Sequence, residues 1–449
     1  MRKLCSRIVF AVTILGMLTI LTVSGSIYYS IPIKLSLQSQ ESNSASLHAN
    51  AGNNALLWNV TWGGADEDCG YSVVVDANGF IYCTGETTSF GAGDKDLALV
   101  KFAPNSTRLW NITWGGANYD LGRSVAVDAN GFIYCTGITY SFGNNLMLVK
   151  FAPNGTKLWN VTWGGTLSDE GRGVAVDANG SIYCFGITVK GSFNSDWALV
   201  KFASNGTKLW NTSWGGAEDD DGFGLAVDAD GFIYCTGNSF SFGSGLPSLA
   251  LVKYTPNGDQ LWNTTWGGAG SHFGYAVTVD ASGSIYCAGH TLNYVEGNYN
   301  GVLIKFTSSG SELWHSIWGG YGDDHASCVA LDANGSIYCG GYLEKPGAST
   351  HDLVVFKYSP NGKQLWNATW GGNSGDLGYG ITLDASGFIY CVGGTNSFGA
   401  GNTDFMLVKF LYTPTGPGGI PGFELVSLLI GVLALLGLGQ RRRLSRTPS

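Results

Sequence analysis

The stretch LWNVTWGGADEDCGYSVVVDANGFIYCTG, residues 57 to 85, carries the pattern that decides the fold. It returns six more times, so that the Trp before Gly-Gly stands at positions 62, 114, 163, 214, 266, 318 and 370, spaced 49 to 52 residues apart. Counted from this Trp, Asp follows at +14 and Cys at +21 in all seven units, with no insertion or deletion between them. Such a fixed period indicates a repeat architecture.

Each unit contains four short runs rich in Val, Ile, Tyr, Phe and Trp, which in the first unit are residues 71–75, 80–84, 97–102 and 108–114. Asp-Ala-Asn-Gly joins the first pair of runs and Pro-Asn-Ser the second, and both are signals for tight hairpins. The body shows no helical period. Four antiparallel strands per unit and seven units predict an all-β fold, a seven-bladed β-propeller of four-stranded blades over residues 56–412.

The ends of the repeat array predict how the ring closes. The last unit ends near Phe410 without a Leu-Trp strand, whereas one such strand, residues 56–62, precedes the first complete unit. We therefore expect strand 56–62 to complete the last blade as its outermost strand, which removes an exposed sheet edge. The units resemble the seven-bladed propeller repeat family that reads roughly Trp-Gly-Gly, Asp, Gly-Tyr, Val-Asp, Gly, Tyr, Gly, Lys-Phe, Gly and Leu-Trp. This resemblance covers 56–412 and implies the fold more than an activity.

Both ends of the chain indicate export. Arg2, Lys3 and Arg7 precede an apolar run and small residues, so residues 1–26 are expected to be a secretory signal peptide or an N-terminal anchor. Residues 27–55 are expected to form a disordered spacer. The linker 413–424 contains Pro-Gly-Phe and leads into 425–449, a short hydrophobic helix with a basic tail. This order resembles the tripartite C-terminal sorting signals of archaeal surface proteins, which implies that a lipid replaces the helix; an ordinary tail anchor is the alternative. Both place the body on the outer cell surface.

Composition excludes one class of partner. Of 24 basic and 33 acidic residues, the terminal segments 1–55 and 413–449 hold eight and two, which leaves a body with 16 basic and 31 acidic residues, net −15. Such a body repels phosphate backbones, so no nucleic-acid partner is expected. The seven cysteines at +21 are expected to be small buried hydrophobes, because equivalent positions on neighbouring blades lie too far apart for disulfides.

The variable loops between second and third strands should surround one mouth of the central channel, and we expect binding on that face. An almost complete acidic ring at +6 belongs to the same face: Asp68, Asp120, Asp169, Asp220, His272, Asp324 and Asp376. One interpretation is that each Asp accepts the amide of the glycine two positions on, as in an Asx turn. The other is a surface for cations or cationic partners. Phenylalanines of the loops are further binding candidates: Phe90, Phe142, Phe242 and Phe398.

Any metal site on this face should be local, because one Ca²⁺ needs six to eight oxygens within about 2.6 Å. The candidate groups are Asp66, Glu67 and Asp68, and Asp219, Asp220 and Asp221. Ca²⁺ is the one cofactor considered; no other is expected. Eleven Asn-x-Ser/Thr sites are candidates for glycosylation, as in a surface glycoprotein: Asn59, Asn105, Asn111, Asn154, Asn160, Asn179, Asn205, Asn211, Asn263, Asn334 and Asn367.

No catalytic motif is found, and the six histidines are scattered singly along the sequence. No catalytic residue and no enzymatic activity are therefore expected. The sequence favours a membrane- or lipid-anchored binding module of the cell surface that recognises a protein or a glycan through its variable-loop face. A structural envelope scaffold and a quinone- or metal-dependent propeller enzyme are the alternatives.

Overall fold

The computed structural model describes residues 19–23, 26–30, 54–191, 194–243, 246–293, 297–320, 322–345 and 347–412. The chain divides into two units, residues 1–44 and 45–449. In the first unit, β1 (Thr19–Val23) and β2 (Ser26–Ser30) pair in an antiparallel two-stranded sheet. Strands β1 and β2 and the start of β3 fall within the expected signal segment 1–26 and spacer 27–55. The rest of these two segments lies outside the described residues, as do the expected linker 413–424 and tail 425–449. Within the described ranges no helix is long and apolar enough to cross a membrane.

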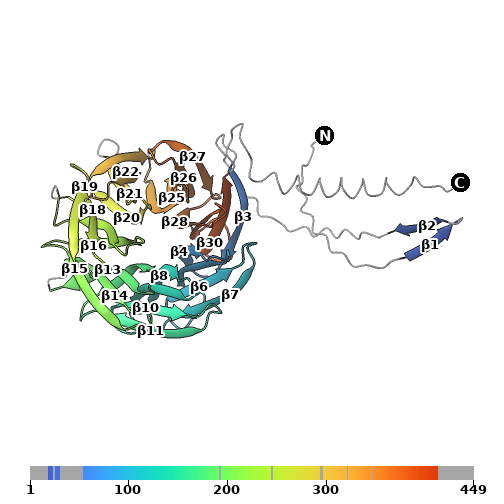
Figure 1. The fold of residues 1–449 in the computed structure, drawn as a ribbon, viewed down its shortest axis with the longest axis horizontal. Helices are drawn as coiled ribbons and strands as arrows, with labels where there is room; N and C mark the ends of the chain where they lie inside the picture. The colour runs from blue at the N-terminus through green and yellow to red at the C-terminus, as the bar shows by residue number, and fades with distance from the viewer. Residues whose placement is uncertain are drawn as a thin grey trace. The chain divides into compact units, whose positions relative to one another are not determined.

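The second unit is a ring of seven antiparallel four-stranded sheets around a central axis (Figure 1), which confirms the predicted β-propeller. The innermost strands are β4 (Asp68–Val75), β8 (Asp120–Val127), β12 (Asp169–Val176), β16 (Asp220–Val227), β20 (His272–Val279), β24 (His325–Leu331) and β28 (Asp376–Leu383). The second strands are β5 (Ile81–Thr87), β9 (Ile133–Thr139), β13 (Ile182–Lys190), β17 (Ile233–Ser239), β21 (Ile285–Asn293), β25 (Ile337–Glu344) and β29 (Ile389–Thr395).

The third strands are β6 (Asp96–Phe102), β10 (Asn145–Phe151), β14 (Asn194–Phe202), β18 (Ser248–Tyr254), β22 (Asn298–Phe306), β26 (His351–Tyr358) and β30 (Asp404–Tyr412). The outer strands are β7 (Arg108–Trp114), β11 (Lys157–Trp163), β15 (Lys208–Trp214), β19 (Gln260–Trp266), β23 (Glu312–Trp318), β27 (Gln364–Trp370) and β3 (Asn54–Trp62). The innermost strand of the first blade begins three residues earlier than predicted, at Asp68, because its pairing with the second strand extends to Asp68 opposite Thr87.

The hydrophobic core lies between blades rather than within one sheet. At the first junction, Tyr82 and Leu99 of the first blade pack with Cys135 and Met147 of the second. The cysteines at +21 are at most 2% exposed, and all nine described cysteines are free thiols. Burial raises the pKa of Cys135 to about 12, so this thiol stays protonated and acts as a small apolar group.

The tight hairpins form one face of the ring, and each blade fixes its own hairpin in the same way. Asp76 at +14 accepts the amides of Asn78 and Phe80, at 2.9 and 3.0 Å, and the hydroxyl of Tyr82 at 3.1 Å. Lys101 lies 4.7 Å above the Tyr82 ring and donates to the carbonyl of Pro153 in the next blade. The repeated Asp, Tyr and Lys therefore hold neighbouring blades together on this face.

Strand β3 closes the ring, as predicted. It pairs antiparallel with β30, with Trp62 opposite Phe405, and it begins at Asn54, two residues before the expected start. Trp62 is 4% exposed and contacts Phe405 and Phe90, with ring centroids 5.9 and 5.3 Å apart. The N-terminal and C-terminal strands of the propeller thus share one blade and one core.

If this strand closes the ring, its buried Trp should contribute strongly to stability. We predict that Trp62→Ala lowers the free energy of unfolding by about 3–5 kcal/mol, as expected for a large buried aromatic. Leu57→Ala, on the exposed side of the same strand, should change it by less than about 0.5 kcal/mol. Urea unfolding followed by tryptophan fluorescence measures both. Equal midpoints for the two variants would contradict the closure.

Candidate functional site

Every innermost strand carries a β-bulge at the residue nine positions after the Trp of Trp-Gly-Gly. In the first blade the pairing with β5 shifts between Gly70 and Ser72, which leaves Tyr71 unpaired, and the other six blades shift at the same point. A bulge turns its extra residue away from the regular alternation of the strand. The seven residues that line the channel for this reason are Tyr71, Arg123, Arg172, Phe223, Tyr275, Ser327 and Tyr379.

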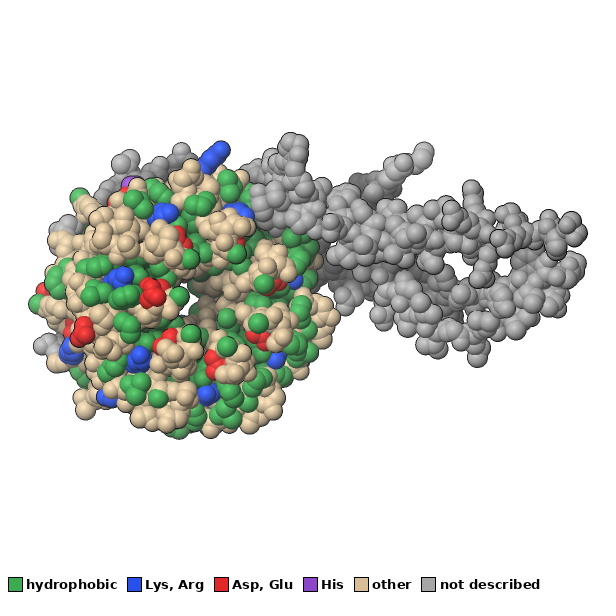
Figure 2. All heavy atoms as spheres, in the orientation of Figure 1, with side chains coloured by type: hydrophobic (Ala, Val, Ile, Leu, Met, Phe, Trp, Pro, Cys, Tyr) green, Lys and Arg blue, Asp and Glu red, His purple; other side chains and the backbone are tan. Residues whose placement is uncertain are grey.

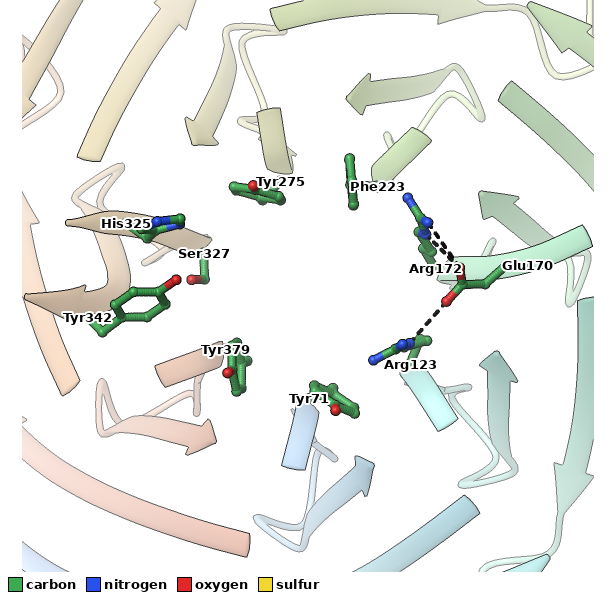
Figure 3. A pocket seen from close by; sticks show the side chains of 10 residues that line it. All are labelled: Tyr71, Arg123, Glu170, Arg172, Phe223, Tyr275, His325, Ser327, Tyr342 and Tyr379. Carbon is green, nitrogen blue, oxygen red and sulfur yellow. Dashed lines mark hydrogen bonds and ion pairs between the residues drawn. The ribbon is translucent and has the colours of Figure 1, made fainter. Parts of the chain in front are cut away.

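Together these residues surround a cavity of about 410 Å³ in the central channel, which Figure 2 shows as an opening at the centre of the ring. Glu170, His325 and Tyr342 complete its wall (Figure 3). Glu170 and His325 lie at the beginning of innermost strands. They are next to the Trp-Gly-Gly linkers, the segments that connect the outer strand of one blade to the innermost strand of the next. The cavity therefore belongs to the end of the channel where the variable loops lie.

Two arginines share one carboxylate on one side of the cavity. Glu170 accepts from Arg123 Nε at 3.0 Å and from Arg172 Nε and Nη2, each at 3.0 Å. Burial raises the pKa of Glu170, but the two guanidinium groups outweigh burial and hold this pKa below its usual value. Arg172 Nη1 has no hydrogen-bond partner among the described residues and lies 4.0 Å from Asp221 Oδ1. The site thus holds fixed donors around one ionised acceptor.

Aromatic rings form most of the remaining wall. The guanidinium of Arg123 lies 4.7 Å from the Tyr71 ring, and that of Arg172 lies 4.5 Å from Phe223. Phe223 in turn contacts Tyr275, with ring centroids 5.1 Å apart. Burial raises the pKa of Tyr342 to about 12, so its phenol is a neutral hydrogen-bonding group. Apolar ring faces alternate with polar groups around the cavity.

Histidines that are separated in the sequence meet beside this cavity. His290 Nδ1 and His325 Nδ1 are 2.9 Å apart, and His325 stacks on Tyr342 with centroids 4.6 Å apart. These two histidines are 35 residues apart in the sequence and meet because the fifth and sixth blades are neighbours. Burial lowers the pKa of His290 to about 3 and that of His325 to about 4.

The predicted acidic ring is present but does not face solvent. Its six aspartates are at most 1% exposed and His272 is 7% exposed. Asp68 accepts the amide of Gly64 at 2.7 Å, the hydroxyl of Ser89 at 2.7 Å and the hydroxyl of Thr87. The expected Asx turn with Gly70 is wrong, because Gly70 pairs with Gly85 in the sheet.

The other members of the ring bind the linker in the same way. Asp120, Asp169, Asp220, Asp324 and Asp376 each accept the amide of the second glycine of their Trp-Gly-Gly, at 2.7 to 2.8 Å. His272 replaces the carboxylate: Nε2 accepts from Gly268 at 3.0 Å, so Nδ1 carries the proton that Thr291 accepts at 2.8 Å. The ring therefore fastens linkers and loops to the blades.

The predicted loop phenylalanines pack on the Trp of the linker. Phe90, Phe142, Phe242 and Phe398 lie with ring centroids 4.9 to 5.5 Å from Trp62, Trp114, Trp214 and Trp370. The first three are 40% to 51% exposed. They lie on the variable-loop face but are not part of the cavity wall.

The two acidic triplets do not gather into metal sites. Glu67 pairs with Lys95 at 3.3 Å while Asp68 turns inward, because neighbouring residues of an extended chain point to opposite sides. Asp219 accepts the amide of Ser195 at 2.9 Å, while Asp221 lies near Arg172. Within the described part of the chain, no three His, Cys, Asp or Glu side chains form a group that could hold a metal ion. Of the eleven predicted glycosylation sites, ten are exposed and Asn367 is half-buried.

Comparison with known proteins shows the fold and little more. No protein-family model matches the chain. The regulatory protein FlaEY of Caulobacter vibrioides is 25% identical over 193 residues, which is 39% of this chain and only 18% of that protein. The WD40 β-propeller domain of Doa1 is similar with a TM-score of 0.51, at 12% identity over 80% of this chain and 97% of that one.

Two further solved structures are similar at this level. They are the Neurospora crassa Pan2 WD40 domain, at 10% identity over 83% of this chain and 98% of that one, and the polysaccharide lyase Uly1, at 12% identity over 78% and 91%, each with a TM-score of 0.50. At such identities the likeness concerns the fold alone. The protein therefore has a β-propeller fold, and a fold by itself does not assign a function.

The histidine pair predicts how stability depends on pH. In the folded protein both imidazole rings stay neutral. The groups that surround them are Phe273, Tyr275, Tyr299, Tyr342 and His351, with Asp323 nearby. In the unfolded chain the pKa of histidine is near 6.5. As pH falls below about 6.5, only the unfolded chain takes up these protons, so stability decreases towards pH 4.

Between pH 6.5 and 5, each histidine should reduce the free energy of unfolding by about 1–2 kcal/mol. Urea unfolding of the wild type and of a His290→Gln/His325→Gln variant at both pH values tests this expectation. The variant should lose less stability than the wild type on acidification. The same loss in both proteins would show that the pair does not exclude protons.

Proposed function

We propose that this protein is a non-catalytic binding module on the outer cell surface and that it recognises a glycan in the channel cavity. The observation that carries the proposal is the ring of bulged residues, which brings side chains from all seven blades to one concave site. Concave sites with apolar walls and few fixed polar groups are the usual form of small-ligand sites.

The chemistry of the wall supports a saccharide ligand. A sugar ring offers apolar C–H faces and a rim of hydroxyls, so it needs flat apolar surfaces beside fixed donors and acceptors. Tyr71, Tyr275 and Tyr379 supply neutral aromatic surfaces with hydroxyls, and the Arg172–Glu170 pair supplies both charges (Figure 3). A cavity of about 410 Å³ suits one or two sugar residues rather than a folded protein domain.

Display on the cell surface is supported by the sequence. Residues 1–26 read as an export signal or anchor, and 425–449 as a hydrophobic helix with a basic tail that attaches the body to the membrane directly or through a lipid. Exposure of ten of the eleven sequons agrees with a glycosylated outer-surface protein. A protein partner that binds the exposed rings of Phe90, Phe142 and Phe242 is the alternative.

The proposal predicts which side chains carry affinity. The full-length protein is screened on an array of neutral and uronic-acid-containing oligosaccharides, and the best oligosaccharide is titrated by calorimetry. Tyr275→Ala and Tyr379→Ala should each weaken binding at least about tenfold, which is 1.4 kcal/mol. Leu209→Ala, exposed on an outer strand, serves as the matched control and should bind like the wild type.

Two outcomes would contradict the proposal. An array on which no oligosaccharide binds, or binding that neither cavity variant weakens, would exclude the cavity as a glycan site. Mass spectrometry of the bound oligosaccharide after incubation tests the non-catalytic part, because a shortened product would show an enzyme.

A further inference from the structure

A second set of side chains meets where neighbouring blades join on the variable-loop face. At six of the seven junctions a side chain from the start of a third strand approaches the +6 residue of the next blade, beside the first glycine of Trp-Gly-Gly. At the junction of the first and second blades, a Cβ on Gly115 would overlap Asp96 Oδ1 and lie 2.8 Å from Asp120 Oδ2. The glycine is therefore required because two carboxylates occupy the space beside it.

The seven junctions differ in charge. Four of them bring two aspartates together: Asp404 with Asp68, Asp96 with Asp120, Asp196 with Asp220, and Asp352 with Asp376. In two others the third-strand residue is neutral, Asn145 with Asp169 and Asn300 with Asp324. In the last, His272 stands in place of the +6 aspartate. Two buried carboxylates side by side are costly unless a cation or a proton lies with them.

Lysines supply that cation at two of the four acidic junctions. Lys190 Nζ lies 2.7 Å from Asp196, and Lys345 Nζ lies 2.8 Å from Asp352 Oδ1. Lys345 also donates to the linker carbonyls of Gly372 and Ser374. Both lysines stand 27 residues after the Trp of their Trp-Gly-Gly. The ammonium of Lys345 lies where one carboxylate and two carbonyls surround a positive charge.

The remaining two acidic junctions have no such lysine. At the equivalent position stand Ser89 and Ser397, and Lys95, next to Asp96, pairs instead with Glu67 and Glu86. Asp96 and Asp404 are 1% exposed, and Asp68 and Asp120 are fully buried. Within the described part of the chain, none of these four carboxylates has an ion pair, and Asp96 Oδ1 has no hydrogen-bond partner.

We propose that these two junctions, between the first and second blades and between the seventh and first, each bind a hard divalent cation such as Ca²⁺. Carboxylate and carbonyl oxygens are the ligands that calcium prefers, and water can complete its shell. The linker carbonyls of Gly116 and Asn118 correspond to those that hold Lys345, and they face Gly93, which presents no side chain. The proposal concerns a structural ion and does not depend on a glycan in the channel.

The test is the calcium content of the full-length protein. After dialysis against EDTA and then about 1 mM CaCl₂, a concentration suited to extracellular sites, elemental analysis should find two Ca²⁺ per chain. Asp96→Asn and Asp404→Asn should each leave one, and the double variant none. Asparagine is a conservative choice, because Asn145 and Asn300 occupy this position in other blades.

Asp196→Asn is the matched control, since Lys190 already neutralises that junction, and it should keep two ions. EDTA should lower the melting temperature of the wild type but leave that of the double variant unchanged, which separates loss of metal from misfolding. A wild type without calcium, or a calcium content that Asp96→Asn and Asp404→Asn do not change, would overturn the proposal. A metal-free wild type whose melting temperature falls less from pH 7 to pH 5 than that of the double variant would show a shared proton instead.

Discussion

In six of the seven blades a buried carboxylate binds the Trp-Gly-Gly linker, and the variable-loop face depends on it. Asp68 holds the amide of Gly64 in the linker, the hydroxyl of Thr87 at the end of the second strand and that of Ser89 in the following loop. A buried carboxylate without such donors would cost several kcal/mol, so linker and loop must keep their conformation while it stays buried. In the fifth blade His272 makes the same two kinds of hydrogen bond without charge, which shows that the geometry matters more than the charge.

Within this rigid frame one position per blade is free to vary. The bulge after Gly70 fixes the backbone, while the bulged residue itself varies between Tyr, Arg, Phe and Ser around the ring. A scaffold of seven nearly equal units therefore presents a wall that is not symmetric: two arginines and Glu170 on one side, and His325 and Tyr342 on the other (Figure 3). Recognition by a concave, asymmetric wall on a stiff ring loses little conformational entropy on binding.

Much of the fold could be predicted from the sequence, because the repeat period, the hairpin signals and the unpaired Leu-Trp strand are local patterns. The candidate site could not be predicted in the same way. Tyr71 follows Gly70 in a strand whose alternation predicts one side for it, and only the bulge places it in the channel. Arg123 and Arg172 are 49 residues apart in the sequence and become neighbours only because consecutive blades do. The +6 aspartates were visible in the sequence, but their burial and their glycine partner were not.

The architecture of the variable-loop face requires that the +6 carboxylates are buried anchors and not a solvent-facing acidic surface. Amide hydrogen exchange of the second linker glycines, read by mass spectrometry or NMR, tests this claim most directly. The amides of Gly64, Gly116, Gly216 and Gly372 should exchange as slowly as those of the inner strands, because each is bonded to a buried carboxylate. Exchange at the rate of exposed loop amides would contradict it.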